Sequence, residues 1–280
     1  MKSLIRLSDL DLRDVQEIFR LADEFRSGKH RKCLRNRTIV LFFPESSIRT
    51  RITYERGIYL MGAQSVLFPP SALDKKEDVR DVVAYLSNWV DAIVVRHRNI
   101  ALLDEMALDS IIPVINAMTD VNHPCEILSD VYALSKRLGD VSEWKILFVG
   151  ACGNIGLAWK EAAALFGFEL TQSCPPKYAM EEVENIPHLM EAARGKDVIC
   201  TDSLSADKLP DFAGYQITPE VMQSSGCQLL NPCPPFYRGE EVSAEVVEND
   251  WNGFVGYDFK SCLLEVQQAI LYYLLFETKA

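Results

Sequence analysis

Short, wholly apolar segments alternate with longer amphipathic ones along most of this chain, and this alternation limits the fold more than any other feature of the sequence. The segment 38–43 reads Thr-Ile-Val-Leu-Phe-Phe and the segment 92–95 reads Ala-Ile-Val-Val, as expected for strands buried on both faces. Between them, the segments 50–61 and 79–90 carry apolar residues at helical spacing. Strands that alternate with helices form parallel sheets, so the sequence predicts an α/β fold.

Two successive series of such segments predict two doubly wound parallel-sheet domains. A second series begins with the apolar strand 145–149 and the glycine that follows it. We expect the first domain to span residues 1–124 and the second residues 125–260, with an apolar helix at 261–280 packing back on the first domain. An amphipathic helix is expected at 7–27, with Ser8 or Asp9 as its N-cap. The remaining strands are expected at 65–68, 114–116, 168–171, 197–200 and 228–230.

Charge and cysteine content argue against several classes of protein. The 280 residues carry a formal net charge of -11, which does not suit a broad surface for nucleic acid or anionic lipid. The first six residues are too short and too charged for a signal peptide, and no apolar run approaches the length of a membrane span. A cytoplasmic location is the default expectation for such a chain. The eight cysteines include no Cys-x-x-Cys pair, so we expect mostly buried, reduced thiols and no metal site.

The segment 47–51, Ser-Ile-Arg-Thr-Arg, lies between a predicted strand and a predicted helix. Free backbone N–H groups at a helix start bind anions, and hydroxyl and guanidinium groups add further donors. The simpler alternative is an ordinary helix cap made by Ser46 or Ser47, with solvated arginines. In an acidic chain, this segment predicts a local phosphate site.

Three further loops at predicted strand ends carry groups that can act on a carbonyl. Arg96 directly follows a strand, where a cation can hold phosphate or polarise a carbonyl oxygen. His123 stands at a helix entrance, where it can donate to a developing oxyanion, and Glu126 lies one turn later. Cys233 lies in a proline-rich loop that presents one thiol and several carbonyls. Ligands of open parallel sheets bind beyond the carboxyl ends of the strands, so we expect the chemistry at these loops.

These loops, in this order, resemble the aspartate/ornithine carbamoyltransferase family over nearly the whole chain. The family's Ser-Thr-Arg-Thr-Arg, Ser-x-x-x-Lys-x-Glu and His-Pro-x-Gln motifs are similar to Ser47-Ile48-Arg49-Thr50-Arg51, to 71–77 with its Lys75, and to His123-Pro124-Cys125-Glu126. The family's carbonyl-binding Arg matches Arg96. The ornithine branch's His-Cys-Leu-Pro is similar to Pro232-Cys233-Pro234-Pro235, and Arg238–Val242 continues the match.

The resemblance implies an enzyme that transfers the carbamoyl group of carbamoyl phosphate to an amine without a cofactor, in a cleft between the two domains. It also implies a homotrimer in which Lys75 is contributed by a neighbouring subunit. The implied carbamoyl-phosphate-binding residues are Ser47, Ile48, Arg49, Thr50, Arg96, His123, Glu126 and Lys75, and the implied catalytic residues are Arg96, His123 and Cys233.

The acceptor is expected to bind in the second domain. Aspartate carbamoyltransferases place an Arg where this chain has Asp202, so an acidic residue there favours a cationic amine. By resemblance to the ornithine branch, Asn154 and Asp202 hold the α-amino acid end of the acceptor, and Cys233 and Pro234 lie near its side-chain amine. The resemblance therefore points to an ornithine-like amino acid, with N-acylornithine, putrescine or aspartate as alternatives.

The chain departs from the family pattern mainly in the expected site. Glu126 stands in place of Gln, Pro232 in place of His, and Ala72 in place of Gln, while 203–207 replaces a Ser-Met-Gly segment. The final helix has no clear partner for the family's Arg, the nearest positions being Lys260 and Leu263. These changes keep open a different acceptor or a ligand-binding paralogue with impaired catalysis.

The segment 150–156 offers a further alternative. Its Gly-x-x-Gly-x-x-Gly spacing is loosely similar to a dinucleotide-binding loop, which would suit an NAD-dependent dehydrogenase. The next predicted strand ends without the carboxylate that binds the ribose in such enzymes.

Overall fold

The computed structural model describes residues 2–248 and 253–277, and these form two compact units. The first unit contains Met1–Tyr132 and Cys262–Ala280, and the second contains Ala133–Ser261. Each unit has its own sheet, and every strand pair in both sheets is parallel. The predicted fold class, two parallel-sheet α/β domains, is confirmed.

The sheet of the first unit has the strand order β2-β1-β3-β4. Its strands are β1 (Thr38–Phe42), β2 (Gln64–Phe68), β3 (Ala92–Arg96) and β4 (Val114–Met118). Four of the five residues of β1 are buried, as are four of β3, which explains their apolar composition. Parallel strands joined by helices bring the ends of β1, β3 and β4 to one edge of the sheet.

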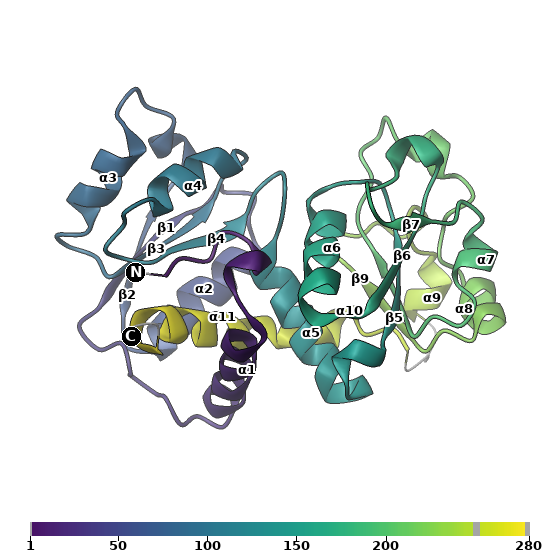
Figure 1. Cartoon of the computed structure of the whole chain (residues 1–280), viewed down its shortest axis with the longest axis horizontal. Helices are drawn as coiled ribbons and strands as arrows, with labels where there is room; N and C mark the ends of the chain where they lie inside the picture. The colour runs from purple at the N-terminus through teal and green to yellow at the C-terminus, as the bar shows by residue number, and fades with distance from the viewer. Residues whose placement is uncertain (1, 249–252, 278–280) are drawn as a thin grey trace. The chain divides into compact units, whose positions relative to one another are not determined.

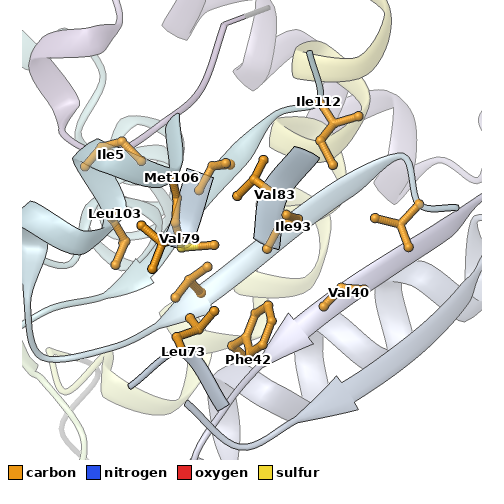
Figure 2. Packing of buried hydrophobic residues seen from close by; sticks show 13 residues of the cluster. Ile5, Val40, Phe42, Leu73, Val79, Val83, Ile93, Leu103, Met106 and Ile112 are labelled. Atoms are coloured by element: carbon orange, nitrogen blue, oxygen red, sulfur yellow. The ribbon is translucent and has the colours of Figure 1, made fainter. Parts of the chain in front are cut away.

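One face of this sheet packs against α3 (Val79–Leu86) and α4 (Ile100–Ala107). Figure 2 shows Val40, Phe42 and Ile93 from the strands among side chains from both helices. Burial of these aliphatic and aromatic side chains stabilises this face of the unit. It fixes the strand ends from which the loops of the site leave.

Three further helices of the first unit lie on the other side of the sheet, namely α1 (Leu12–Arg26), α2 (Arg49–Leu60) and α11 (Leu263–Tyr272) (Figure 1). The N-cap of α1 is Asp11, whose side chain accepts hydrogen bonds from the backbone of Arg13 and Asp14. The expected caps Ser8 and Asp9 were therefore wrong, because residues 7–9 form a separate short 3-10 helix before α1. The predicted apolar helix at 261–280 corresponds to α11 and the π-helical turn Tyr273–Glu277 that follows it, while residues 278–280 lie outside the described residues. A separate short helix, α10 (Gly256–Ser261), precedes it.

The sheet of the second unit has the strand order β7-β6-β5-β8-β9. Its strands are β5 (Lys145–Val149), β6 (Glu169–Ser173), β7 (Glu184–Asn185), β8 (Val198–Thr201) and β9 (Leu229–Pro232). Strand β7 was not expected, because two residues are too short to show a periodic pattern. The helices are α6 (Asn154–Phe166), α7 (Leu189–Ala192), α8 (Pro219–Ser225), α9 (Ala244–Glu248) and α10. Short 3-10 helices occur at Leu7–Asp9, Pro70–Leu73, Val141–Glu143, Pro176–Tyr178 and Leu209–Phe212, and a π-helical turn occurs at Tyr273–Glu277.

Helix α5 (Pro124–Leu138) begins in the first unit and ends in the second. The expected domain limit at residue 124 falls at the start of this helix, whereas the contacts divide the chain after Tyr132. None of the helices within 2–248 and 253–277 combines the length and the apolar character that crossing a bilayer requires.

Candidate active site

The predicted phosphate loop connects β1 to α2. Its Ser47 and Thr50 are buried, with 2% and 5% of their surface exposed, whereas Ile48 is 66% exposed. The N-cap of α2 is Ile48, and its side chain makes no capping hydrogen bond. The alternative of a hydroxyl cap from Ser46 or Ser47 is therefore wrong for this helix. The N–H groups at the start of α2 remain suited to an anion.

The two arginines of the loop differ in their surroundings. Arg51 Nε donates to Glu55 Oε1 at 2.7 Å, an ion pair one turn along α2. Arg49 is exposed and forms no ion pair with any residue in the described part of the chain. Arg49 is therefore the better placed of the two to hold a phosphate.

Arg96, at the end of β3, reaches the phosphate loop. Its Nη1 donates to Ser47 Oγ at 3.1 Å, across 49 residues of sequence. The β3–β4 register shifts between Val95 and Arg96, so that Arg96 pairs with Met118. Such an irregularity changes the direction of a side chain at a strand end. The structure thus brings together two residues that the sequence assigned to one substrate.

His97, the residue that follows β3, is linked to the segment that carries Lys75. The backbone N–H of Asn99 donates to His97 Nδ1 at 3.1 Å, which leaves the proton of the neutral ring on Nε2. That nitrogen lies 2.9 Å from Asp74 Oδ1. Only 11% of the His97 side chain is exposed. The sequence singled out Arg96, but nothing in it indicated this tether to the residue preceding Lys75.

His123 and Glu126 lie where β4 leads into α5. The His123 carbonyl accepts the first helical hydrogen bond, from Ile127 N at 3.2 Å. His123 Nε2 lies 3.9 Å from Glu126 Oε2, and both side chains are buried. Glu126 in the first turn of α5 is favoured by the helix dipole.

The loop before His123 is held by a buried amide network. Asn116 Nδ2 donates to Asn122 Oδ1 at 2.6 Å and to the Ile5 carbonyl at 2.8 Å. Thr119 Oγ1 accepts from Asn122 N at 3.1 Å. All of the polar side chains in this network are buried, so the position of His123 is restricted by several bonds at once.

The expected acceptor residues lie in the second unit, at the carboxyl ends of three adjacent strands. Asn154 opens α6 after β5, Asp202 follows β8, and Cys233 and Pro234 follow β9. Because β5 pairs with β8 and β8 with β9, these loops leave the same edge of one sheet. The backbone N–H of Cys233 donates to the Thr201 carbonyl at 3.0 Å, which joins the last two loops.

Asp202 is the residue of this group with a strongly altered titration. Burial, with a smaller contribution from the nearby Glu241, raises its pKa, while a hydrogen bond from Ser203 N at 2.8 Å and the charge of Lys208 lower it, and the net result is a pKa of about 6. A cationic ligand would stabilise the ionised form of a carboxyl in these surroundings.

Two of the three glycines of the segment 150–156 have a packing explanation. A Cβ on Gly156 would lie 2.8 Å from a ring carbon of Phe148 and 3.0 Å from Met180 Sδ. A Cβ on Gly150 would lie 3.1 Å from the same ring. Packing against Phe148 therefore accounts for Gly150 and Gly156 without a dinucleotide, whereas a Cβ on Gly153 would make only an ordinary contact, 3.8 Å from the Ala151 carbonyl oxygen. In the part of the chain that the structure describes, no three His, Cys, Asp or Glu side chains are grouped to hold a metal ion.

Two family models match this chain along almost its whole length. Residues 2–136 match the aspartate/ornithine carbamoyltransferase carbamoyl-P binding domain, and residues 142–274 match the Asp/Orn binding domain of the same family. The chain belongs to the aspartate/ornithine carbamoyltransferase family. The resemblance noted in the sequence is thus confirmed, and the family's two domain models coincide broadly with the two structural units.

Ornithine carbamoyltransferases are among the curated relatives within this family. That of Methanothermobacter thermautotrophicus is 31% identical over 98% of this chain and 99% of its own length. That of Nitrosococcus oceani is 32% identical over 95% of each chain. The solved ornithine carbamoyltransferase of Burkholderia thailandensis is 28% identical with a TM-score of 0.89, and covers 99% of both chains. That of Thermus thermophilus is 26% identical with a TM-score of 0.90, and covers 98% of this chain and 99% of its own.

Proposed function

We propose that this protein is a carbamoyltransferase that moves the carbamoyl group of carbamoyl phosphate to the side-chain amine of an ornithine-like amino acid and releases phosphate. The observation that carries the proposal is the hydrogen bond from Arg96 to Ser47. It joins a carbonyl-polarising cation to a phosphate-binding loop, which is the pairing that this substrate needs. The similarity to ornithine carbamoyltransferases over the whole chain supports the same activity.

The first unit binds carbamoyl phosphate in this proposal. Ser47, Arg49 and Thr50 hold the phosphate group together with the N–H groups at the start of α2. Lys75 adds a further positive charge and is contributed by a neighbouring subunit. Holding the leaving phosphate in place stabilises the charge that it acquires as the bond to the carbamoyl carbon breaks.

Arg96, His123 and Thr50 act on the carbamoyl group itself. They donate to the carbonyl oxygen, which becomes an oxyanion when the neutral amine attacks the carbon. Glu126 accepts from the carbamoyl NH2, as do backbone carbonyls near Cys233 and Pro234. These interactions strengthen in the tetrahedral intermediate and so lower the barrier.

The second unit binds the acceptor. Asp202 and Asn154 hold the α-amino acid end, and Cys233 lies near the reacting amine. The raised pKa of Asp202, about 6, supports a cationic partner, because an ammonium group favours the ionised carboxylate.

The proposal includes a homotrimer. All five residues of the edge strand β2 are exposed, and three of them, Val66, Leu67 and Phe68, are large apolar residues that are 36–40% exposed. On the neighbouring α2, Ile52 and Tyr59 are 57% and 75% exposed. An exposed apolar face of this kind supports association between copies of the chain. Sedimentation velocity tests it, and a monomer at micromolar concentration would count against it. A cytoplasmic location belongs to the same proposal and is supported by the eight free thiols.

Carbamoyl transfer can be measured with carbamoyl phosphate labelled at its carbon. The purified protein is incubated with ornithine, N-acylornithine, putrescine or aspartate, and the products are separated. We expect labelled citrulline from ornithine. Robust labelling of another amine without citrulline would identify that amine as the acceptor in place of ornithine. Binding of carbamoyl phosphate without transfer to any amine would favour the catalytically impaired paralogue.

A further inference from the structure

Two acceptor loops of the second unit are joined by a buried carboxylate to which the sequence motifs assign no role. The loop after β8 carries Asp202, and the loop after β9 carries Cys233. Glu241 lies further along the second of these connections, between β9 and α9, and is 5% exposed. Its Oε1 accepts from Leu204 N at 2.9 Å, and its Oε2 accepts from Tyr237 N at 2.7 Å. One carboxylate therefore ties the two loops together.

The backbone of Glu241 is itself fixed to the core of the unit. Ile217 N donates to the Glu241 carbonyl at 2.9 Å, and Ser243 N donates to the Ile217 carbonyl at 2.9 Å. Ile217 and Val242 are fully buried in the same apolar cluster. The carboxylate thus projects from a rigid segment and not from a free loop.

Two backbone donors on a buried carboxylate form charge-assisted hydrogen bonds, which are stronger than neutral ones. They offset the desolvation of the carboxylate, which would otherwise be unfavourable at this depth. Removing the carboxylate would leave the N–H groups of Leu204 and Tyr237 without this acceptor. Both loops would then lose a point of attachment at the same time.

Glu241 also affects Asp202 through its charge. Among the groups around Asp202, Glu241 raises the pKa of that carboxyl, while Lys208 and the hydrogen bond from Ser203 N lower it. Glu241 accordingly has two separable effects, one on the geometry of the loops and one on the electrostatics of the expected acceptor-binding carboxyl.

We propose that Glu241 is a positioning and specificity-determining residue for the acceptor, holding the Asp202 and Cys233 loops together and adding negative charge where a cationic amino acid binds. This inference rests on the proposed function for the identity of the acceptor. The hydrogen bonds that carry it are present whatever the acceptor is.

Three variants separate the two effects. Glu241→Gln keeps the size of the side chain but removes the charge and one acceptor oxygen. Glu241→Asp keeps the charge but shortens the reach to the loops by one methylene. Glu240→Gln is the matched control, since it removes the same charge from the exposed neighbouring residue.

The variants are compared by titration calorimetry with L-ornithine in the presence of phosphate, over a range of pH, and by amide hydrogen exchange. We expect Glu241→Gln to weaken ornithine binding about 10-fold and to move the acid limb of the binding profile to lower pH, because the pKa of Asp202 falls when a neighbouring negative charge is lost. Glu241→Asp is expected to weaken binding while leaving the acid limb in place. In both variants, the amides of Leu204 and Tyr237 should exchange faster, and Glu240→Gln should match the wild type.

An acid limb that stays in place in a folded Glu241→Gln protein would overturn the electrostatic role. Unchanged amide exchange at Leu204 and Tyr237 in Glu241→Asp would overturn the positioning role. If Glu241→Gln does not fold, Glu241→Asp still tests that role. The affinity of inorganic phosphate should be the same in all proteins. A wild type that binds ornithine but transfers no carbamoyl group would defeat the proposed function and leave this inference standing, whereas a wild type that does not bind ornithine would defeat both.

Discussion

Arg96 Nη1 donates to Ser47 Oγ at 3.1 Å, which joins the end of β3 to the loop that precedes α2. Ser47 is buried, and Arg96 is partly buried. The phosphate loop and the group proposed to polarise the carbonyl are therefore parts of one hydrogen-bonded unit. A change in either residue should affect the other.

Arg96→Lys should lower kcat by on the order of 100-fold, because a lysine ammonium does not reproduce the planar donor fork that reaches both Ser47 and a carbonyl oxygen. Steady-state kinetics with saturating carbamoyl phosphate measure this. The control is Arg98→Lys, the same exchange two residues away at an exposed position. A kcat equal to that of the control would contradict the assignment.

Arg49→Ala should weaken phosphate binding by about 100-fold while the protein remains folded, because it removes a charge-assisted donor from an exposed position. Calorimetry with inorganic phosphate and the unfolding temperature together test this. Arg56→Ala removes an exposed arginine from the same helix and should leave phosphate affinity unchanged. Wild-type affinity in Arg49→Ala would remove this residue from the site.

Acceptor binding should fail in acid as Asp202 takes up a proton. Its pKa is raised to about 6, so the carboxyl is ionised above that pH and neutral below it. We expect the KM for ornithine to rise as pH falls below about 6, and Asp202→Asn to have a high KM at every pH. A wild-type KM without an inflection between pH 5 and 7 would disagree with this role.

The same carboxyl should destabilise the folded protein above pH 6. A pKa higher in the folded state than its ordinary value of 3.8 means that folding disfavours the ionised form, so the destabilisation develops between pH 4 and 6 and is complete above that range. Asp202→Asn should therefore stabilise the protein by about 3 kcal/mol at pH 7.5 and have little effect at pH 4. Thermal unfolding at the two pH values measures the difference, and an equal effect at both would refute it.

His97→Ala should raise the KM for carbamoyl phosphate about 5-fold with a smaller change in kcat, because the hydrogen bond to Asp74 holds the loop that carries Lys75. His97→Gln retains a donor that can reach Asp74 and should restore most of the affinity. Equal KM values for carbamoyl phosphate in the two variants would show that the hydrogen bond to Asp74 does not contribute to binding of this substrate. A double-mutant cycle with Asp74→Ala measures the coupling between the two residues directly.

Local sequence patterns were sufficient for much of the fold. The apolar runs of β1 and β3 and the helical spacing of α2 and α3 are properties of neighbouring residues, and burial on both faces of a parallel strand requires such runs. Strand β7 and the short helix α10 were not predicted, because segments of two to six residues carry too little periodicity.

The residue types of the candidate site were likewise visible in the sequence, as motifs that each lie within one loop. Their relations to one another were not. Ser47 and Arg96 are 49 residues apart, and Asp74 and His97 are 23 apart, so their contacts depend on the strand order β2-β1-β3-β4. No spacing rule specifies that order.

The sequence by itself determined the alternating architecture, the family and the loops that carry the chemistry, since each of these is recorded in short contiguous segments. Only the tertiary structure decided that Arg51 is paired with Glu55, that burial raises the pKa of Asp202, and that Glu241 joins two loops. The physical reason is that desolvation and hydrogen-bond partners are set by whatever packs against a group, and in a folded chain those neighbours come largely from elsewhere in the sequence.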